Sequence, residues 1–173
     1  MKYKARICVR GDLQPLSLQE TYAATLAFRV FQALMALTTA FGLEAEQLDA
    51  VNAFLNAALN EEIYCYFPEG FEEDLDYCLK LLQALYGLRR SPLLWLQELI
   101  AMLIDLGLQN ISGEPCLFTN DDGIILFFFV DDFTLLYHPA KTEIAQAFKR
   151  ALQQRFQIRD MGDLQWFLGV RVL

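Results

Sequence analysis

The segment "GIILFFFVDDFTLLYH", residues 123–138, decides the fold. Apolar runs flank the adjacent carboxylates Asp131 and Asp132, and each run has the length of a buried strand. The segment therefore predicts a β-hairpin with strands at 124–130 and 133–137 and a turn at the two aspartates. Adjacent like charges between buried strands are costly unless a positive group compensates them. The hairpin therefore needs a positive partner.

Three helices are expected in the rest of the chain. A capping-box spacing, S-x-x-E at 17–20, precedes a helical segment over about 20–41. A Ser-Pro pair at 91–92 starts a second helix, which ends at Gly107. A third, amphipathic helix follows Pro139. Its inner face is expected to consist of Ile144, Phe148, Ala151 and Leu152, and its outer face of Lys149, Arg150, Gln153 and Gln154.

Short strands separate these helices. They are expected at residues 3–10, in the segment that ends at Asp49, at 62–67, at 78–82, and as a closing pair within 162–173. A tight helical turn is expected after Asp49. Helices that alternate with short strands and one hairpin indicate an α+β fold, with an antiparallel or mixed sheet and helices packed on one face.

Composition indicates a folded chain. Of its 173 residues, 55% are hydrophobic, which is enough for one domain with a well-filled core and excludes a disordered chain. No apolar run approaches the roughly 18–20 residues of a membrane helix, and the first residues lack the apolar stretch of a signal peptide. The four cysteines form no C-x-x-C pair, which is typical of reduced core residues in an intracellular protein.

Charge argues against extensive nucleic-acid contacts. The net charge is −8, whereas phosphate contacts need Lys and Arg. Residues 1–10 nevertheless contain four basic and no acidic side chains, while 44–76 are rich in acids and contain no base. A nucleic-acid partner would therefore contact only a limited part of the chain.

Carboxylates from two segments are expected to meet. Asp49 ends another apolar-flanked strand, so it can converge with Asp131 and Asp132 on one sheet edge. Carboxylates from neighbouring strands are typical ligands of a hard cation such as Mg²⁺. Paired Mg²⁺ ions support phosphoryl transfer. The alternative is an exposed turn with solvated carboxylates. The single histidine, His138, is interpreted as a loop residue.

Five blocks of sequence stand out: "KARICVRGD" (4–12), "QLDAVNAFLNAALNEEIYCYFPEGF" (47–71), "CLKLLQALYGLRRSPLLW" (78–95), "FFFVDDF" (127–133) and "DMGDLQWFLGVRV" (160–172). In family order, these blocks resemble the reverse transcriptase of copia-type LTR retrotransposons. They cover nearly the whole chain and resemble the fungal branch in particular. The resemblance implies a fingers-plus-palm fold in one domain, 1–173. Partial fingers and the first palm helix would occupy 1–48, and the palm through the primer grip 49–173.

The resemblance also implies roles for individual residues. Asp49 and Asp131 resemble the metal-binding aspartates and Asp132 their less direct partner, together holding two Mg²⁺ ions for which Mn²⁺ can substitute. Phe54 stands where the family places a steric gate that favours deoxynucleotides. The other residues that resemble family contacts are Lys4, Arg6, Tyr86 and Gly87 for the nucleotide, and Arg89, Arg90, Phe167, Leu168 and Gly169 for template and primer.

Several of these residues also have a purely structural interpretation. Phe54 can be a core aromatic residue. The block that starts at Tyr86 can be a helix-capping turn, and Lys4 and Arg6 can lie on a solvated edge strand. Trp166, beside the primer-grip block, is interpreted as a packing residue rather than one that stacks on a base.

The implied function is RNA-directed DNA polymerase activity, the Mg²⁺-dependent transfer of a nucleotide from a dNTP to a primer 3′-OH on an RNA template. The expected polypeptide partners are the thumb, RNase H and integrase of a polyprotein; the thumb and RNase H are expected to be absent from this chain, and no membrane partner is expected. The fold and metal-site geometry should survive without them, whereas processive polymerisation should not. The expected location is intracellular, in a cytoplasmic virus-like particle, with a nuclear phase also allowed.

Two other functions stay open at this point. One is a non-catalytic, truncated relic of such a domain, which would keep the fold and show no turnover. The other is a different palm-type nucleotidyl transferase, such as a cyclase, which also uses carboxylates at strand ends to bind Mg²⁺. The Tyr86-Gly87 pair and the primer-grip block do not support the cyclase.

Overall fold

The computed structural model describes residues 6–15, 19–68, 70–71 and 76–172. The chain divides into two compact units. Unit 1 comprises the described parts of 1–23 and 54–98, and unit 2 those of 24–53 and 99–173. The expected boundary between fingers and palm at residues 48 and 49 stays a prediction, because compactness does not assign a function to either unit.

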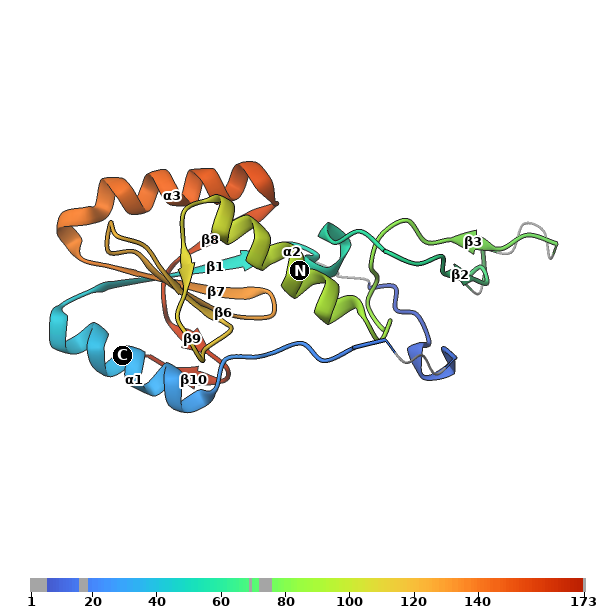
Figure 1. Cartoon of the computed structure of the whole chain (residues 1–173), viewed down its shortest axis with the longest axis horizontal. Coiled ribbons are helices and arrows are strands. Elements are labelled where there is room, and N and C mark those ends of the chain that lie inside the picture. The colour runs from blue at the N-terminus through green and yellow to red at the C-terminus, as the bar shows by residue number, and fades with distance from the viewer. Residues whose placement is uncertain (1–5, 16–18, 69, 72–75, 173) are drawn as a thin grey trace. The chain divides into compact units, whose positions relative to one another are not determined.

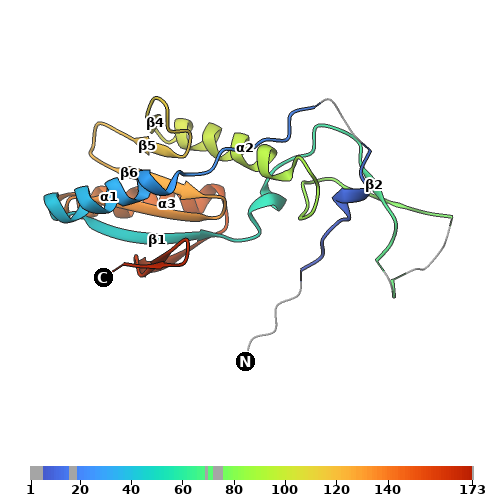
Figure 2. The ribbon, with the colours of Figure 1, turned by 90° about the horizontal axis from the view of Figure 1, so that it is seen from below.

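Unit 2 is built on a six-stranded antiparallel sheet (Figure 1). Its strands in spatial order are β4 (Gln109–Asn110), β5 (Leu117–Thr119), β6 (Ile125–Phe129), β7 (Asp132–Tyr137), β1 (Glu44–Ala50) and β8 (Ile158–Asp163). Figure 2 shows β1, β6, β5 and β4 in this order across the sheet. The predicted hairpin is β6–β7, and the predicted strand that ends near Asp49 is β1. The expected α+β class is confirmed.

Helices α1 (Phe28–Phe41) and α3 (Thr142–Arg155) lie on opposite faces of this sheet (Figure 1). The ring of Phe31 on α1 is 6.1 Å from that of Phe127, whereas Lys149 on α3 pairs with Glu46. Phe127 shares a face with Thr134, its partner on β7, and Glu46 shares a face with Leu135, the next residue of β7. Because consecutive strand residues face opposite sides, Phe127 and Glu46 lie on opposite faces of the sheet. The expectation that the helices share one face is therefore wrong for α1.

Helix α1 begins at Phe28 rather than near residue 20. Residues 19–27 are not helical. Leu26 is buried, and the carbonyl of Ala24 accepts a hydrogen bond from the Cys116 thiol, so tertiary contacts hold this segment extended. The expected cap at Ser17 falls outside the described residues. The helix ends at Phe41, as expected, and Gly42 caps it in the left-handed conformation at φ 58°.

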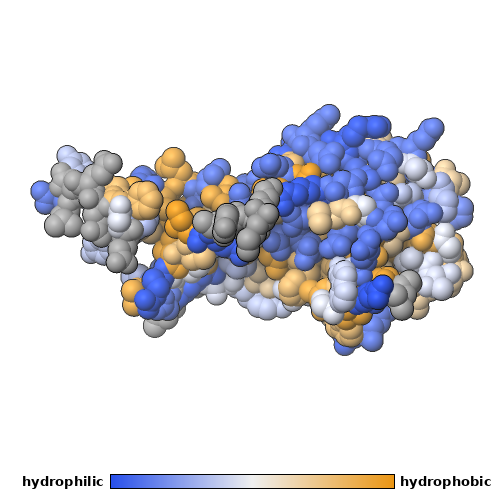
Figure 3. Space-filling view, turned by 180° about the vertical axis from the view of Figure 1, so that it is seen from behind, coloured by the Kyte–Doolittle hydropathy of each residue, from blue (hydrophilic) through white to orange (hydrophobic). Residues whose placement is uncertain are grey.

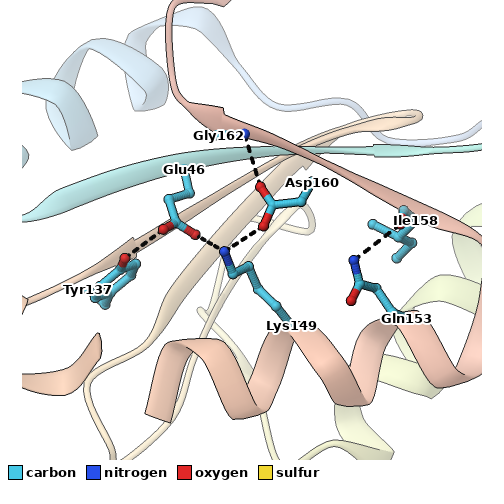
Figure 4. A network of polar contacts seen from close by, with 7 residues as sticks. All are labelled: Glu46, Tyr137, Lys149, Gln153, Ile158, Asp160 and Gly162. Carbon is cyan, nitrogen blue, oxygen red and sulfur yellow. Dashed lines mark hydrogen bonds and ion pairs between the residues drawn. The ribbon is translucent and has the colours of Figure 1, made fainter. Parts of the chain in front are cut away.

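Helix α3 is fixed to the sheet by a buried cation, shown in Figure 4. Lys149 was expected on the outer face, and this prediction is wrong, since its side chain is 6% exposed. Its ammonium donates to Asp160 on β8 at 2.7 Å and pairs with Glu46 on β1, which also accepts from the Tyr137 hydroxyl. Burial alone would lower the pKa of Lys149, but these carboxylates outweigh it and raise that pKa.

Helix α2 (Ser91–Asp105) and the C-terminal hairpin complete the expected elements of the second half of the chain. The α2 helix is followed by Gly107 at φ 86°, as predicted. The hairpin consists of β9 (Trp166–Phe167) and β10 (Val170–Arg171). Within the described residues, no helix combines the length and apolarity needed to cross a membrane.

Unit 1 has little regular structure. A short antiparallel pair, β2 (Tyr64–Cys65) and β3 (Leu79–Lys80), confirms the two strands expected there, while residues 6–10 belong to no strand. Several large hydrophobic side chains of this unit reach the surface, and Figure 3 shows orange, hydrophobic patches on the molecular surface. The most exposed of those described are Ile7, Leu13, Tyr22, Tyr66, Phe71, Tyr77 and Leu82. Such surface is typical of a part of a larger assembly.

Candidate active site

Three charged side chains form a row across neighbouring strands of unit 2. Asp49 on β1 lies directly opposite Asp132 on β7 and directly opposite Arg159 on β8. Directly opposed residues of antiparallel strands project from the same face of the sheet. The register therefore places two carboxylates and one guanidinium side by side.

The turn that carries Asp131 is tighter than the sequence predicts. Phe129 pairs with Asp132, so only Val130 and Asp131 form the loop, and Asp132 is the first residue of β7. Val130 has φ 60°, a left-handed conformation that is costly for a β-branched residue. The Ala50 amide donates to the Asp131 carbonyl at 2.9 Å. The turn is thereby fastened to the end of β1, next to Asp49.

The carboxylates at this edge interact electrostatically. Partial burial raises the pKa of Asp132, and the charges of Asp131 and Asp49 raise it further. A hydrogen bond from the Gln47 side chain acts in the opposite direction and favours the ionised form. The site is thus a concentration of negative charge, partly relieved by Gln47 and by Arg159, whose Nη1 is 3.6 Å from Asp49 Oδ2.

The donor set fits a hard divalent cation. In the described part of the chain, no three His, Cys, Asp or Glu side chains are gathered closely enough to hold a metal ion by themselves. Mg²⁺, however, usually takes only one or two carboxylates from the protein and completes its shell with water and substrate phosphates. Asp49 and Asp132, opposed in register and adjoined by Asp131, satisfy that smaller requirement.

The residues expected at the nucleotide belong to unit 1. The ring of Phe54 is 4.7 Å from that of Tyr86, and the Arg6 guanidinium lies 4.5 Å from the centre of the Tyr86 ring. Phe54, Tyr86 and Arg6 therefore form one aromatic and cationic cluster. Lys4 lies outside the described residues.

Gly87 is required by a close approach of two backbone segments. Its φ is 94°, and a Cβ atom there would lie 2.0 Å from the Val9 carbonyl oxygen. Gly11 makes the reciprocal approach, since its Cβ would lie 1.9 Å from the Gly87 carbonyl oxygen. The Val9 amide donates to the Tyr86 carbonyl at 2.8 Å in the same place. These glycines hold the Arg6 segment against the Tyr86 loop.

The two arginines expected at the template make internal contacts. Arg90 is 13% exposed and its Nη1 donates to Asn60 at 2.7 Å and lies 3.3 Å from Glu61. Arg89 donates through Nη2 to the Asp12 carbonyl at 3.3 Å. Both side chains connect loops of unit 1 in this structure, and their contact with template stays a prediction.

The expected primer-grip block is the tip of the β9–β10 hairpin. Leu168 and Gly169 form its turn, both with positive φ. Phe167 is 2% exposed and its ring stacks on that of Phe31 at 4.8 Å, so it packs in the core of unit 2. Trp166 is 54% exposed, so the interpretation of Trp166 as the packing residue is wrong. Alternation along β9 points the two aromatic rings to opposite sides.

Sequence reasoning missed two polar residues of the carboxylate site. Gln47 lies two positions before Asp49 on β1 and therefore on the same face, a signal that strand periodicity could have given. Arg159 could not have been found in this way, because its strand was not predicted and the partner of that strand is more than a hundred residues away.

A sequence model of the reverse transcriptase (RNA-dependent DNA polymerase) family matches residues 1–173. The chain belongs to this family. The match covers every block that suggested the resemblance, and the relatives below confirm its copia-type character. No solved structure matches the reverse transcriptase chain.

Similar proteins come from plant and yeast transposons. The retrovirus-related Pol polyprotein from transposon TNT 1-94 of Nicotiana tabacum is 32% identical over the full chain, which spans 14% of that protein. The Pol polyprotein from transposon RE2 of Arabidopsis thaliana is 31% identical over 98% of the chain, which spans 12% of that protein. The putative transposon Ty5-1 protein of Saccharomyces cerevisiae is 33% identical over 72% of the chain and 42% of its own length. The chain corresponds to the reverse transcriptase domain of such polyproteins.

Proposed function

We propose that this domain is the catalytic part of an RNA-directed DNA polymerase, which transfers a nucleotide from a dNTP to the 3′-OH of a primer on an RNA template. One observation carries the proposal. Asp132 lies directly opposite Asp49 in the sheet, and the Asp131 carbonyl is bonded to the residue after Asp49. The resemblance implies carboxylates gathered at the ends of neighbouring strands, and the adjacent ends of β1 and β7 supply them.

Asp49, Asp131 and Asp132 would hold the two divalent cations, Mg²⁺ or in its place Mn²⁺. When bound, the cations activate the attacking hydroxyl and stabilise the leaving group. The chain contributes position and charge. The Ala50–Asp131 hydrogen bond fixes the turn beside β1, and Gln47 opposes the burial and repulsion that raise the pKa of Asp132. The Gln47 hydrogen bond favours the ionised form of Asp132, which is the form that could bind a cation.

The Phe54–Tyr86 pair supports a second part of the proposal. An aromatic ring fixed by a second ring 4.7 Å away is a rigid steric element. We assign Phe54 as the gate that disfavours a ribose 2′-OH, with Lys4, Arg6, Tyr86 and Gly87 as nucleotide contacts. Phe54→Ala is expected to increase the use of rNTPs relative to dNTPs, while Tyr77→Ala, which removes an exposed aromatic ring of unit 1, should not.

We further propose that unit 2 is the palm and that other domains of a Pol polyprotein complete the enzyme. The polyprotein relatives support this, since the chain spans only 14% and 12% of the two plant proteins. The proposed partners are the thumb, RNase H and integrase together with RNA template and DNA primer, and the proposed place of action is an intracellular particle.

A non-catalytic relic is the second candidate. It is favoured by one relative, a truncated transposon Ty1-A Gag-Pol polyprotein of Saccharomyces cerevisiae, which is 29% identical over 77% of the chain. Truncated copies therefore occur among the relatives of this domain.

Single-nucleotide extension tests the proposal. A DNA primer on an RNA template is incubated at low salt with Mg²⁺, one dNTP and the parent chain, Asp49→Asn, Asp131→Asn or the control Asp121→Asn, which changes an exposed aspartate in a different turn. Extension by the parent and the control, but not by the two site variants, supports the polymerase. A folded parent that neither extends the primer nor binds Mn²⁺ through Asp49 supports the relic.

A further inference from the structure

The positive group beside the carboxylates is a residue of the chain itself. Arg159 Nη1 lies 3.6 Å from Asp49 Oδ2, and these are directly opposed residues of β8 and β1. The pair is open to solvent, with 57% of the Arg159 side chain and 31% of the Asp49 side chain exposed. At this distance the contact is an ion pair without a hydrogen bond.

A local irregularity of the sheet sets this position. The β1–β8 register shifts between Gln47 and Leu48, so that Leu48 is opposite Asp160 and Asp49 is opposite Arg159. The neighbour of Arg159, Asp160, is held from the other face of the sheet by Lys149, as Figure 4 shows, and its second oxygen accepts from the Gly162 amide at 2.9 Å. Successive strand residues face opposite sides, so anchoring Asp160 directs Arg159 towards Asp49.

We propose that Arg159 is the exchangeable counter-ion of Asp49: it neutralises this carboxylate in the metal-free enzyme and is displaced from it when a divalent cation binds. The inference rests on the proposed role of Asp49 as a metal ligand. A cation that approaches Asp49 meets a guanidinium at the same oxygen, so the two compete for one carboxylate. Because the pair is exposed and lacks a hydrogen bond, it is weak enough to be exchanged.

The same reasoning gives the pair a use. Without a counter-charge, Asp49, Asp131 and Asp132 would repel one another in the metal-free state, because Asp49 lies directly opposite Asp132 and Asp131 precedes Asp132 in the chain. Arg159 reduces that repulsion at Asp49, with which it forms an ion pair.

Mn²⁺ binding, measured by the electron paramagnetic resonance signal of the free ion without nucleotide or nucleic acid, tests the exchange. Arg159→Gln is expected to bind Mn²⁺ about two- to fivefold more tightly than the parent, because a competing surface ion pair has been removed. Arg159→Lys keeps the charge and should bind like the parent. The matched control is Arg155→Gln, which removes an equally exposed arginine (55%) paired with Asp105 at 3.9 Å. It measures the effect of net charge alone.

Three results overturn the inference. Affinity of Arg159→Gln equal to or below that of Arg155→Gln excludes competition at Asp49, and so does an Arg159→Lys variant that binds as tightly as Arg159→Gln. If Asp49→Asn binds Mn²⁺ as the parent does, the proposed metal site itself fails and the inference fails with it. If Asp49→Asn binds Mn²⁺ more weakly but Arg159→Gln has no effect, the metal site stands and only the exchange with Arg159 is excluded. Failure of the metal site and failure of the exchange are therefore distinguishable. Circular dichroism spectra of all variants exclude unfolding as the cause.

Discussion

Asp132 lies directly opposite Asp49 in the β1–β7 pair, and the Asp49 charge contributes, after burial and Asp131, to the raised pKa of Asp132. A carboxyl with a raised pKa binds its proton more tightly in the folded state, so its ionisation lowers stability as the pH rises from 3.8 through that raised pKa. The chain therefore tolerates a repulsive arrangement at neutral pH.

Asp132→Asn is accordingly expected to stabilise the chain at neutral pH, by about 1 kcal/mol. The difference from the parent should vanish below pH 3.8, where the carboxyl is protonated in both folded and unfolded states. Urea unfolding at both pH values measures it. Asp121→Asn, in an exposed turn, is the control. A destabilised Asp132→Asn at neutral pH would contradict the repulsion.

Lys149→Met should destabilise the chain strongly. It leaves the Glu46 carboxylate, 15% exposed, without its ammonium partner, and breaking such a pair costs about 3 kcal/mol. Arg150→Met, the next residue of α3 and exposed, should change the free energy of unfolding by less than about 0.5 kcal/mol. Adding Glu46→Gln to Lys149→Met should recover part of the loss. If both methionine variants unfold at the same urea concentration, the anchoring role is wrong.

The ion pair between Lys149 and Asp160 makes the free energy of unfolding depend on pH in a definite direction. The pKa of Lys149 is raised above 10.5, so its contribution to stability is complete below pH 10.5 and is lost as the pH rises through the raised value. Burial raises the pKa of Asp160, but Lys149 and the Gly162 amide outweigh it and lower that pKa below 3.8. Its contribution is therefore lost as the pH falls through the lowered value. The stability difference between the parent and Lys149→Met should shrink at both extremes.

Gly87→Ala should disrupt unit 1. The residue has φ 94°, and the added Cβ would lie 2.0 Å from the Val9 carbonyl oxygen. Gly70→Ala in the same unit measures the cost of the backbone conformation alone, because its φ is 85° and no atom of the described residues lies within 4 Å of the added Cβ. Gly70→Ala should cost about 1 kcal/mol, and Gly87→Ala at least about 2 kcal/mol more. Thermal unfolding compares them. Equal costs would show that the Val9 contact yields easily.

The elements that could be predicted from sequence are those with strong local signals. The hairpin around Asp131, helix α2 with its Ser-Pro start, and the apolar face of α3 all follow from spacing within a few residues. Strand β8 was missed, because five of its six residues are exposed and it contains Gly162, so no apolar alternation marks it. A polar strand on the edge of a sheet is recognised only through its partner, β1.

The errors at individual residues have the same origin. Lys149 looks like a surface residue on a helical wheel and is buried, because its partners Glu46 and Asp160 come from two other strands. The start of α1 was misplaced because the contact between Ala24 and Cys116 joins segments far apart in the chain. Asp49, by contrast, could be placed near Asp132 from sequence. Asp49 lies near the end of one strand and Asp132 at the start of another, and neighbouring antiparallel strands bring these two ends together.

Trp166 and Phe167 should give opposite results when each is replaced by alanine. Phe167 is buried and stacks on Phe31, so Phe167→Ala should lower the free energy of unfolding by about 3–5 kcal/mol. Trp166 is 54% exposed, so Trp166→Ala should change it by less than about 1 kcal/mol.

Trp166, and not Phe167, is the residue whose exposed ring could contact a primer–template directly. Stacking of an exposed aromatic ring on an unpaired base contributes about 1–3 kcal/mol, so Trp166→Ala should weaken binding of a primer–template with a single-stranded template overhang by at least severalfold while the chain stays folded. Fluorescence anisotropy of a labelled duplex at low salt measures this. Unchanged binding by Trp166→Ala would mean that the β9–β10 hairpin does not present this ring to nucleic acid, and the expected primer contact would then rest on Leu168 and Gly169 at its turn alone.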